Sequence, residues 1–174
     1  DGLTMVGIAA RAGITHTSIY HYFTSVEAIL AGLVSRMMED FDRGVEARVA
    51  QADTPLALVE AFLDSLTLGF ETYRSSPVAR GLWAASRYLP ALRKIDDEDT
   101  ARNSRLFSER FLALAPEADP DAIRCTTQLT ASLVVPAYEA ALSMEASLQD
   151  IVVENFLVMI RAHYHAVLHL ESPV

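Results

Sequence analysis

Apolar residues recur at spacings of three and four along almost the whole chain, and no run alternates convincingly as a half-buried strand would. This pattern predicts an all-α protein. Turn signals after residue 50 divide the remainder of the chain into five helices. In order, they are expected at about residues 55–74, a short stretch around Trp83, 90–114, 121–144 and 147–170.

The first 50 residues carry the start and stop signals of three helices. Thr4 is suited to cap a short helix that ends before Gly13, because glycine accepts the left-handed backbone of a helix end. Thr15 is suited to cap a second short helix that runs to about Tyr22. A hydroxyl residue at position 24 or 25 then caps a long third helix that continues to about residue 50.

Two short helices joined by a glycine-containing turn form the layout of a helix-turn-helix, whose second helix enters the DNA major groove. Ile19 and Phe23 of the second helix are spaced to face inward. The polar residues then lie on the outer side and suit hydrogen bonds to base edges and phosphates: Thr15, His16, Thr17, Ser18 and Tyr20. Two short helices in an ordinary bundle remain the alternative.

The amino-acid sequence of this segment resembles that of a known family. Residues 4–15 (TMVGIAARAGIT), 18–23 (SIYHYF) and 26–30 (VEAIL) are similar to the DNA-binding domain of the TetR family of transcriptional regulators. The resemblance covers about residues 3–33. It implies that Thr4 caps its helix near a phosphate, and that Tyr20 and Tyr22 touch the sugar-phosphate backbone. It further implies base contacts from three residues: His16, Thr17 and Ser18.

The chain departs from the family pattern in three ways. Val26 stands where the family often has a lysine, so one phosphate contact is lost. Thr17 stands where glycine or proline is common. The family's first helix is expected to be missing, and with it a layer over Ile8, Ile14 and Phe23.

Charge is divided unevenly along the chain. The net charge of −9 argues against a nucleic-acid partner for the chain as a whole. Residues 1–36 are neutral, however, with two acidic and two basic residues, whereas the remainder holds 21 acidic and 12 basic ones. We therefore expect the DNA-binding domain at residues 1–36, and a helical ligand-binding and dimerisation domain at residues 37–174.

Aromatic and scattered polar residues on the helices of residues 55–144 indicate a ligand cavity. Trp83 is costly to bury unless its indole N–H finds a partner, and its short helix is bracketed by Pro77 and Pro90. The expected ligand is a small apolar or aromatic molecule with few polar groups. The candidate lining residues are Phe62, Leu66, Phe70, Trp83, Asn103, Phe107, Thr130 and Tyr138.

The final helix is apolar almost all round, although a surface helix needs only one apolar stripe. The surplus predicts burial on a second side. A two-fold contact between the last two helices of two chains is the simplest closed solution, which makes the protein a homodimer. The candidate interface residues are Leu133, Ala137, Ala141, Met144, Val152, Phe156 and Ile160.

Other possible sites are weaker. The cluster of His163, His165 and His169 splays around a helix, so no metal site is expected. Residues 96–99 (DDED) are expected to be a solvated acidic stretch, and Cys125 a buried thiol. No catalytic constellation or phosphate loop is recognisable, so neither an enzyme nor a cofactor is expected.

Together these features predict a cytoplasmic TetR-type repressor without a membrane span. It would bind double-stranded operator DNA and leave it when a small apolar effector binds. The alternative is an all-α ligand carrier or enzyme in which the N-terminal motif is only structural.

Overall fold

A computed structural model describes residues 3–170 of the chain, and this part is all-α, with eight helices and no strand. The predicted fold class is therefore confirmed. The helices are α1 (Met5–Ala12), α2 (His16–Tyr22), α3 (Val26–Gln51), α4 (Pro55–Ser75), α5 (Pro77–Ser86), α6 (Pro90–Leu114), α7 (Pro120–Leu142) and α8 (Ala146–Val167).

Local sequence signals set most helix starts. Each of the helices from α4 to α7 begins with proline, whose fixed φ suits the first turn and whose missing N–H is not needed there. The hydroxyl of Thr54 accepts the N–H of Ala57 at 3.1 Å at the start of α4. Asp119 caps α7 in the same way, with its carboxylate 2.9 Å from the N–H of Asp121.

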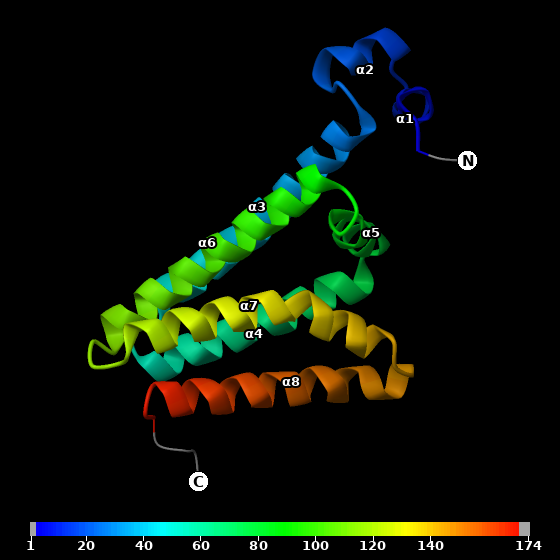
Figure 1. The fold of residues 1–174 in the computed structure, drawn as a ribbon. Helices are drawn as coiled ribbons and strands as arrows, with labels where there is room; N and C mark the ends of the chain where they lie inside the picture. The colour runs from blue at the N-terminus through cyan, green and yellow to red at the C-terminus, as the bar shows by residue number, and fades with distance from the viewer. Residues whose placement is uncertain (1–2, 171–174) are drawn as a thin grey trace.

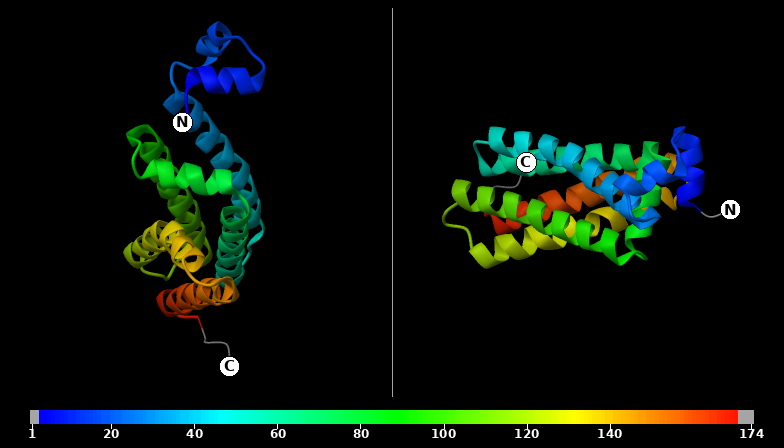
Figure 2. Two further views of the ribbon diagram at one scale, coloured as in Figure 1. Left: turned by 90° about the vertical axis from the view of Figure 1, so that its right-hand side faces the viewer. Right: turned by 90° about the horizontal axis from the view of Figure 1, so that it is seen from above.

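The small N-terminal unit stands at one end of a helical bundle (Figure 1). Helix α3 leads from α1 and α2 into this bundle, where α6 lies beside it, and α4, α7 and α8 complete the bundle (Figure 2). Helix α5 lies at the end of the bundle nearest the N-terminal unit (Figure 1). The boundary expected after residue 36 falls inside α3, so the two units share one continuous helix.

The main core joins α3, α4, α6, α7 and α8. Leu58, Phe111, Ile123 and Tyr164 come from α4, α6, α7 and α8, and all four are fully buried. The ring of Tyr164 stacks on Phe111 with centroids 4.9 Å apart. Burial of this kind contributes about 1.5–3 kcal/mol for each large side chain, so the bundle is the stable part of the molecule.

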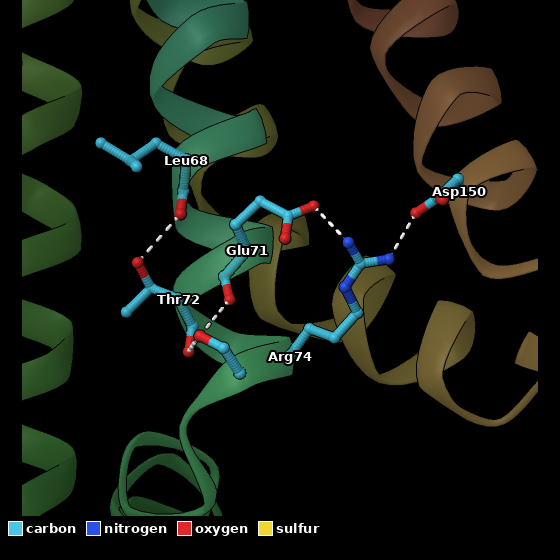
Figure 3. Close-up of polar contacts among 6 residues, drawn as sticks. Leu68, Glu71, Thr72, Arg74 and Asp150 are labelled. Atoms are coloured by element: carbon cyan, nitrogen blue, oxygen red, sulfur yellow. Dashed lines mark hydrogen bonds and ion pairs between the residues drawn. The ribbon is translucent and has the colours of Figure 1, made fainter.

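Two arginines link α8 to α4. Arg74, at the end of α4, places one nitrogen 2.6 Å from Asp150 of α8 and another 2.6 Å from Glu71 (Figure 3). Arg161 of α8 forms a two-pronged pair with Glu60, at 2.9 and 2.7 Å. Half-exposed pairs of this kind add little stability, so the position of α8 against α4 is set mainly by the buried core.

Two further observations bear on the sequence-based expectations. No helix within residues 3–170 combines the length and the apolar run that a membrane crossing requires. Cys125 is exposed, so its expected burial as a core thiol was wrong.

Candidate functional site

The turn between α1 and α2 is fixed by hydroxyl caps and one glycine. Thr4 accepts the N–H of Gly7 at 3.1 Å, and Thr15 accepts the N–H of Ser18 at 3.1 Å, as the sequence predicts. Gly13 closes α1 with φ at 69°, a left-handed conformation that other residues adopt only with strain. These local contacts set the angle at which α2 leaves α1.

A core of three buried residues holds this unit together. Met5 and Ala9 of α1 pack against Ile19 of α2, and Val26 and Ile29 at the start of α3 lie against them. Ile19 therefore faces inward as expected.

Phe23 is 37% exposed and does not belong to this buried core, although its ring lies near α3, where a Cβ at Gly32 would be 3.8 Å away. The expectation that Phe23 faces inward therefore holds only in part. Ile14 is likewise 43% exposed.

The outer side of α2 carries an exposed polar surface. Tyr22 is 79% and Tyr20 is 47% exposed. The rings of His16 and Tyr20 pack in a T-shaped arrangement, with centroids 4.9 Å apart. Thr17 is exposed beside them, and so are Thr4 and Thr15. These side chains are available to a partner along α2 and at the start of α1.

Ser18 differs from its neighbours on α2. It is only half-buried, but its hydroxyl lies 2.8 Å from that of Thr15 and its N–H is bound to the same oxygen. Its contacts in the free protein therefore serve the helix cap.

A cavity of about 150 Å³ lies among α3, α4, α5, α6 and α7. Six of the eight residues proposed from the sequence line it: Phe62, Leu66, Trp83, Asn103, Phe107 and Tyr138. Phe70 and Thr130 do not line it. Phe70 packs against Tyr138 and lies under the guanidinium of Arg74, while Thr130 is buried with its hydroxyl 2.7 Å from the carbonyl of Thr126.

Helix α3 supplies a wall of the cavity that sequence reasoning missed. Met37, Met38, Phe41 and Val45 all line it, outside the helices of residues 55–144 where the cavity was expected. Their spacing of three and four on one stripe is the signal that could have revealed this wall.

Tyr138 is a fixed part of the opposite wall. Its hydroxyl donates to the carbonyl of Leu66 at 2.5 Å, and burial raises the pKa of this phenol above its ordinary value. Gly69 makes the contact possible, since a Cβ there would lie 2.7 Å from the tyrosine oxygen.

The acidic stretch at residues 96–99 is only partly solvated, which corrects the expectation from the sequence. Asp97 and Glu98 are exposed, but Asp96 and Asp99 share one face of α6 and line the cavity. Burial, with repulsion from Asp96, raises the pKa of Asp99 to about 6. Burial also raises the pKa of Asp96, with repulsion from Asp97 adding to it.

The proposed dimer face needs a correction of helical phase. Ala141 is fully buried and Ile160 is 3% exposed, so both belong to the core of their own chain. Val152 and Phe156 are partly buried against that core, and Ala137 is half-buried. Leu133 and Met144, by contrast, are 42% and 43% exposed.

Other apolar residues of the same two helices are exposed, although they are not among the candidate interface residues. They are Leu129 on α7, and Leu148, Ile151, Val158 and Met159 on α8. Because α8 is apolar almost all round, its sequence alone did not separate the inner side from the outer one.

The three histidines near the C-terminus do not converge. Within residues 3–170, no group of three His, Cys, Asp or Glu side chains is placed to hold one metal ion. The Nε2 atom of His163 lies instead 3.1 Å from the hydroxyl of Thr126.

A helix-turn-helix joined by one long helix to a helical bundle with a cavity is the layout of a helical protein with a separate DNA-binding motif. Comparison with known families agrees with this class. Residues 1–33 match the family described as bacterial regulatory proteins of the tetR family, and residues 53–166 match the tetracyclin repressor-like C-terminal domain. The chain belongs to the TetR family.

Curated relatives are regulators as well. The chain is 26% identical over 122 residues to the HTH-type transcriptional regulator BetI 2 of Chromohalobacter salexigens, covering 67% of this chain and 58% of the relative. It is 29% identical over 122 residues to the HTH-type transcriptional regulator BetI of Burkholderia thailandensis, covering 67% and 61%. The matched part thus spans about three fifths of these relatives' length.

Proposed function

We propose that the protein is a DNA-binding transcriptional repressor, and that a small, largely apolar or aromatic molecule in the cavity releases a homodimer from operator DNA. The exposed polar surface of α2 would meet the major groove. The proposed contacts remain Thr4, Thr15, His16, Thr17, Ser18, Tyr20 and Tyr22, with Thr15 and Ser18 acting chiefly through the helix cap.

The continuity of α3 carries this proposal. Val26 and Ile29 near its start pack against the helix-turn-helix core, whereas Phe41 and Val45 line the cavity. Phe41 lies twelve positions after Ile29, which corresponds to about 18 Å along the helix at ~1.5 Å per residue. Because a packed helix moves as a rigid rod, a ligand that displaces Phe41 would also displace α2.

Helix α5 gives the ligand a second route to α3. Trp83 of α5 lines the cavity, and its neighbour Leu82 packs in one cluster with Val34 and Met38 of α3. Arg80 of α5 also donates to the carbonyl of Tyr73 at 3.2 Å, which ties the helix to the end of α4. A ligand that favours one position of Trp83 would therefore favour one position of α3.

The exposed apolar residues of α7 and α8 support a dimer through these helices. A large exposed apolar patch is rare on monomeric proteins, so several exposed apolar residues on two neighbouring helices favour a partner surface. A two-fold contact would place two α2 helices on the same side of the dimer, and their separation would have to match successive major grooves. The revised interface residues are Leu129, Leu133, Met144, Leu148, Ile151, Val158 and Met159.

The test combines DNA binding with the fluorescence of Trp83, which is the only tryptophan in the sequence. Genomic fragments are screened in a band-shift assay, and a library of hydrophobic compounds is then titrated against the bound fragment. We expect compounds that release DNA also to change Trp83 emission. Compounds that release DNA without changing this emission, and that still act on Trp83→Leu, would place the sensor elsewhere. If no fragment is shifted, the proposal that the protein is a DNA-binding regulator would be contradicted.

A further inference from the structure

The cavity wall carries more negative charge than the neighbouring cations neutralise. Asp96 and Asp99 line it from α6, and the amide of Asn103 joins Asp99, at 3.2 Å, to the buried Asp42 of α3, at 2.9 Å. Arg102 pairs with both Asp42 and Asp99, so one guanidinium serves two carboxylates. Asp96 has no ion-pair partner in the part of the chain that the structure describes.

The surroundings of these carboxylates disfavour their charge. Only 17% of the Asp99 side chain is exposed. The pKa values of Asp96 and Asp99 are raised first by lost hydration, and then by repulsion from Asp97 at Asp96 and from Asp96 at Asp99. Donors on Trp83 and Ser86 offset part of this effect at Asp96. A positive charge placed between the two carboxylates would supply what water and Arg102 do not.

The remaining wall is aromatic and apolar. Trp83, Phe41, Phe62, Phe107 and Tyr138 all contribute to it. The faces of aromatic rings carry partial negative charge and attract cations, most strongly where water is excluded. Rings and carboxylates together select a charge that is spread over an apolar body rather than a bare metal ion.

The size of the cavity agrees with such a ligand. A cavity of about 150 Å³ is large enough for a molecule of the size of benzene. A second, more open hollow of about 210 Å³ shares Trp83 and Asp96 with it. Asp96 thus lies where the two spaces meet. Arg87 also lines the outer hollow, but its charge is paired with Glu139.

We infer that the cavity binds an organic cation, an amine or quaternary ammonium ion with an apolar or aromatic body, whose charge is held by Asp96 and Asp99. This inference rests on the proposed function, since it names the charge of the effector for the same cavity.

The test compares two probes of the same shape. Phenyltrimethylammonium carries a positive nitrogen where tert-butylbenzene has a neutral carbon. Both are titrated against the protein with Trp83 emission as the readout, and against Asp96→Asn and Asp99→Asn. Asp97→Asn is the matched control, because Asp97 is an exposed neighbour of equal charge that does not line the cavity.

We expect the protein to bind the cation at least about ten-fold more tightly than the neutral probe. Asp96→Asn and Asp99→Asn should each remove most of this preference while leaving tert-butylbenzene binding within about two-fold. Asp97→Asn removes only the repulsion that Asp97 exerts on Asp96, and it should change the affinity for each probe by less than about two-fold. Thermal melts of the variants check that they fold, and two separate carboxylate variants keep the test informative if one of them does not.

Equal affinity for the two probes, or a preference that survives both cavity variants, would overturn the inference. Failure to bind either probe would overturn it as well. The band-shift assay without any compound separates these results from failure of the proposed function. A protein that binds DNA and prefers the neutral probe remains a regulator, but one with an uncharged effector.

Discussion

The two ends of the molecule hold their side chains in place by different means. Among the described residues of the helix-turn-helix, only Met5, Ala9 and Ile19 are buried. Hydroxyl caps and one left-handed glycine define where its helices begin and end. In the bundle, long-range packing fixes each helix, and polar groups such as Asp42 and Thr130 are buried with partners. The first arrangement exposes side chains on an independent unit, whereas the second can enclose a cavity and respond to its contents.

The largest expected difference between the two ends is their response to the truncation of a buried side chain. Phe111→Ala removes a fully buried ring from the bundle and should lower the free energy of unfolding by about 3–5 kcal/mol. Ile19→Ala should instead abolish DNA binding while the thermal midpoint of the bundle stays nearly unchanged. Circular dichroism melts and band shifts on both variants measure this. A large fall in the bundle midpoint for Ile19→Ala would show that the two units are one cooperative structure.

Charge on the exposed face of α8 should break the dimer and leave the protomer folded. Ile151→Arg places a cation at a residue that is 51% exposed, within the proposed interface, and should give monomers in sedimentation. Leu56→Arg is the control, because Leu56 is 48% exposed on α4 and outside that interface. A dimer that survives Ile151→Arg would remove this face from the account.

Removal of an exposed tyrosine should weaken DNA binding only when the tyrosine lies in the helix-turn-helix. Tyr22→Ala should weaken DNA binding by about 1.5–3 kcal/mol with little change in stability, because a hydrogen bond to a charged phosphate would be lost. Tyr88→Ala is matched to it, since Tyr88 is 82% and Tyr22 is 79% exposed. Equal effects of the two variants in a fluorescence anisotropy titration would count against a role for α2 in DNA binding.

A smaller effect concerns pH and the bundle. The pKa of Asp99 is raised in the folded chain to about 6, so the folded state holds this proton more tightly than the unfolded state does. The group therefore lowers stability as the pH rises from about 4 through 6. Asp99→Asn should raise the thermal midpoint more at pH 7 than at pH 5. Asp97→Asn removes an exposed charge that only repels Asp96, so it should give a smaller difference between the two pH values. The same gain at both pH values would mean that the Asp99 carboxylate is not strained by its charge.

Local signals explain what could be predicted from the sequence. The caps at Thr4 and Thr15 and the bounds of α6, from Pro90 to Leu114, agree with the structure. Hydroxyl caps, proline and glycine act over three or four residues, so they need no knowledge of the tertiary fold.

The residues that were misplaced depend on packing partners. Ala141 and Ile160 were assigned to the dimer face because an almost uniformly apolar helix does not show which side meets its own bundle. Asp96 and Asp99 were taken as solvated because four consecutive acidic residues suggest an exposed surface, although residues three apart share one face of a helix. The burial of either pair of residues could not be predicted before the positions of the neighbouring helices were known.

The central claim is that α3 couples the cavity to the helix-turn-helix, and the coupling can be measured directly. DNA affinity is determined with and without the compound that changes Trp83 emission most, for the parent protein and for two glycine pairs in α3. Arg36→Gly with Glu39→Gly weakens the helix at exposed residues between its two ends, and Glu46→Gly with Ala50→Gly weakens it beyond the cavity.

We predict that the compound weakens DNA binding of the parent and of the 46/50 variant by about ten-fold or more, and that of the 36/39 variant by less than about three-fold. The 36/39 variant should still bind DNA and the compound separately. Full coupling in the 36/39 variant would contradict the account, because the signal would then reach α2 by a path other than α3.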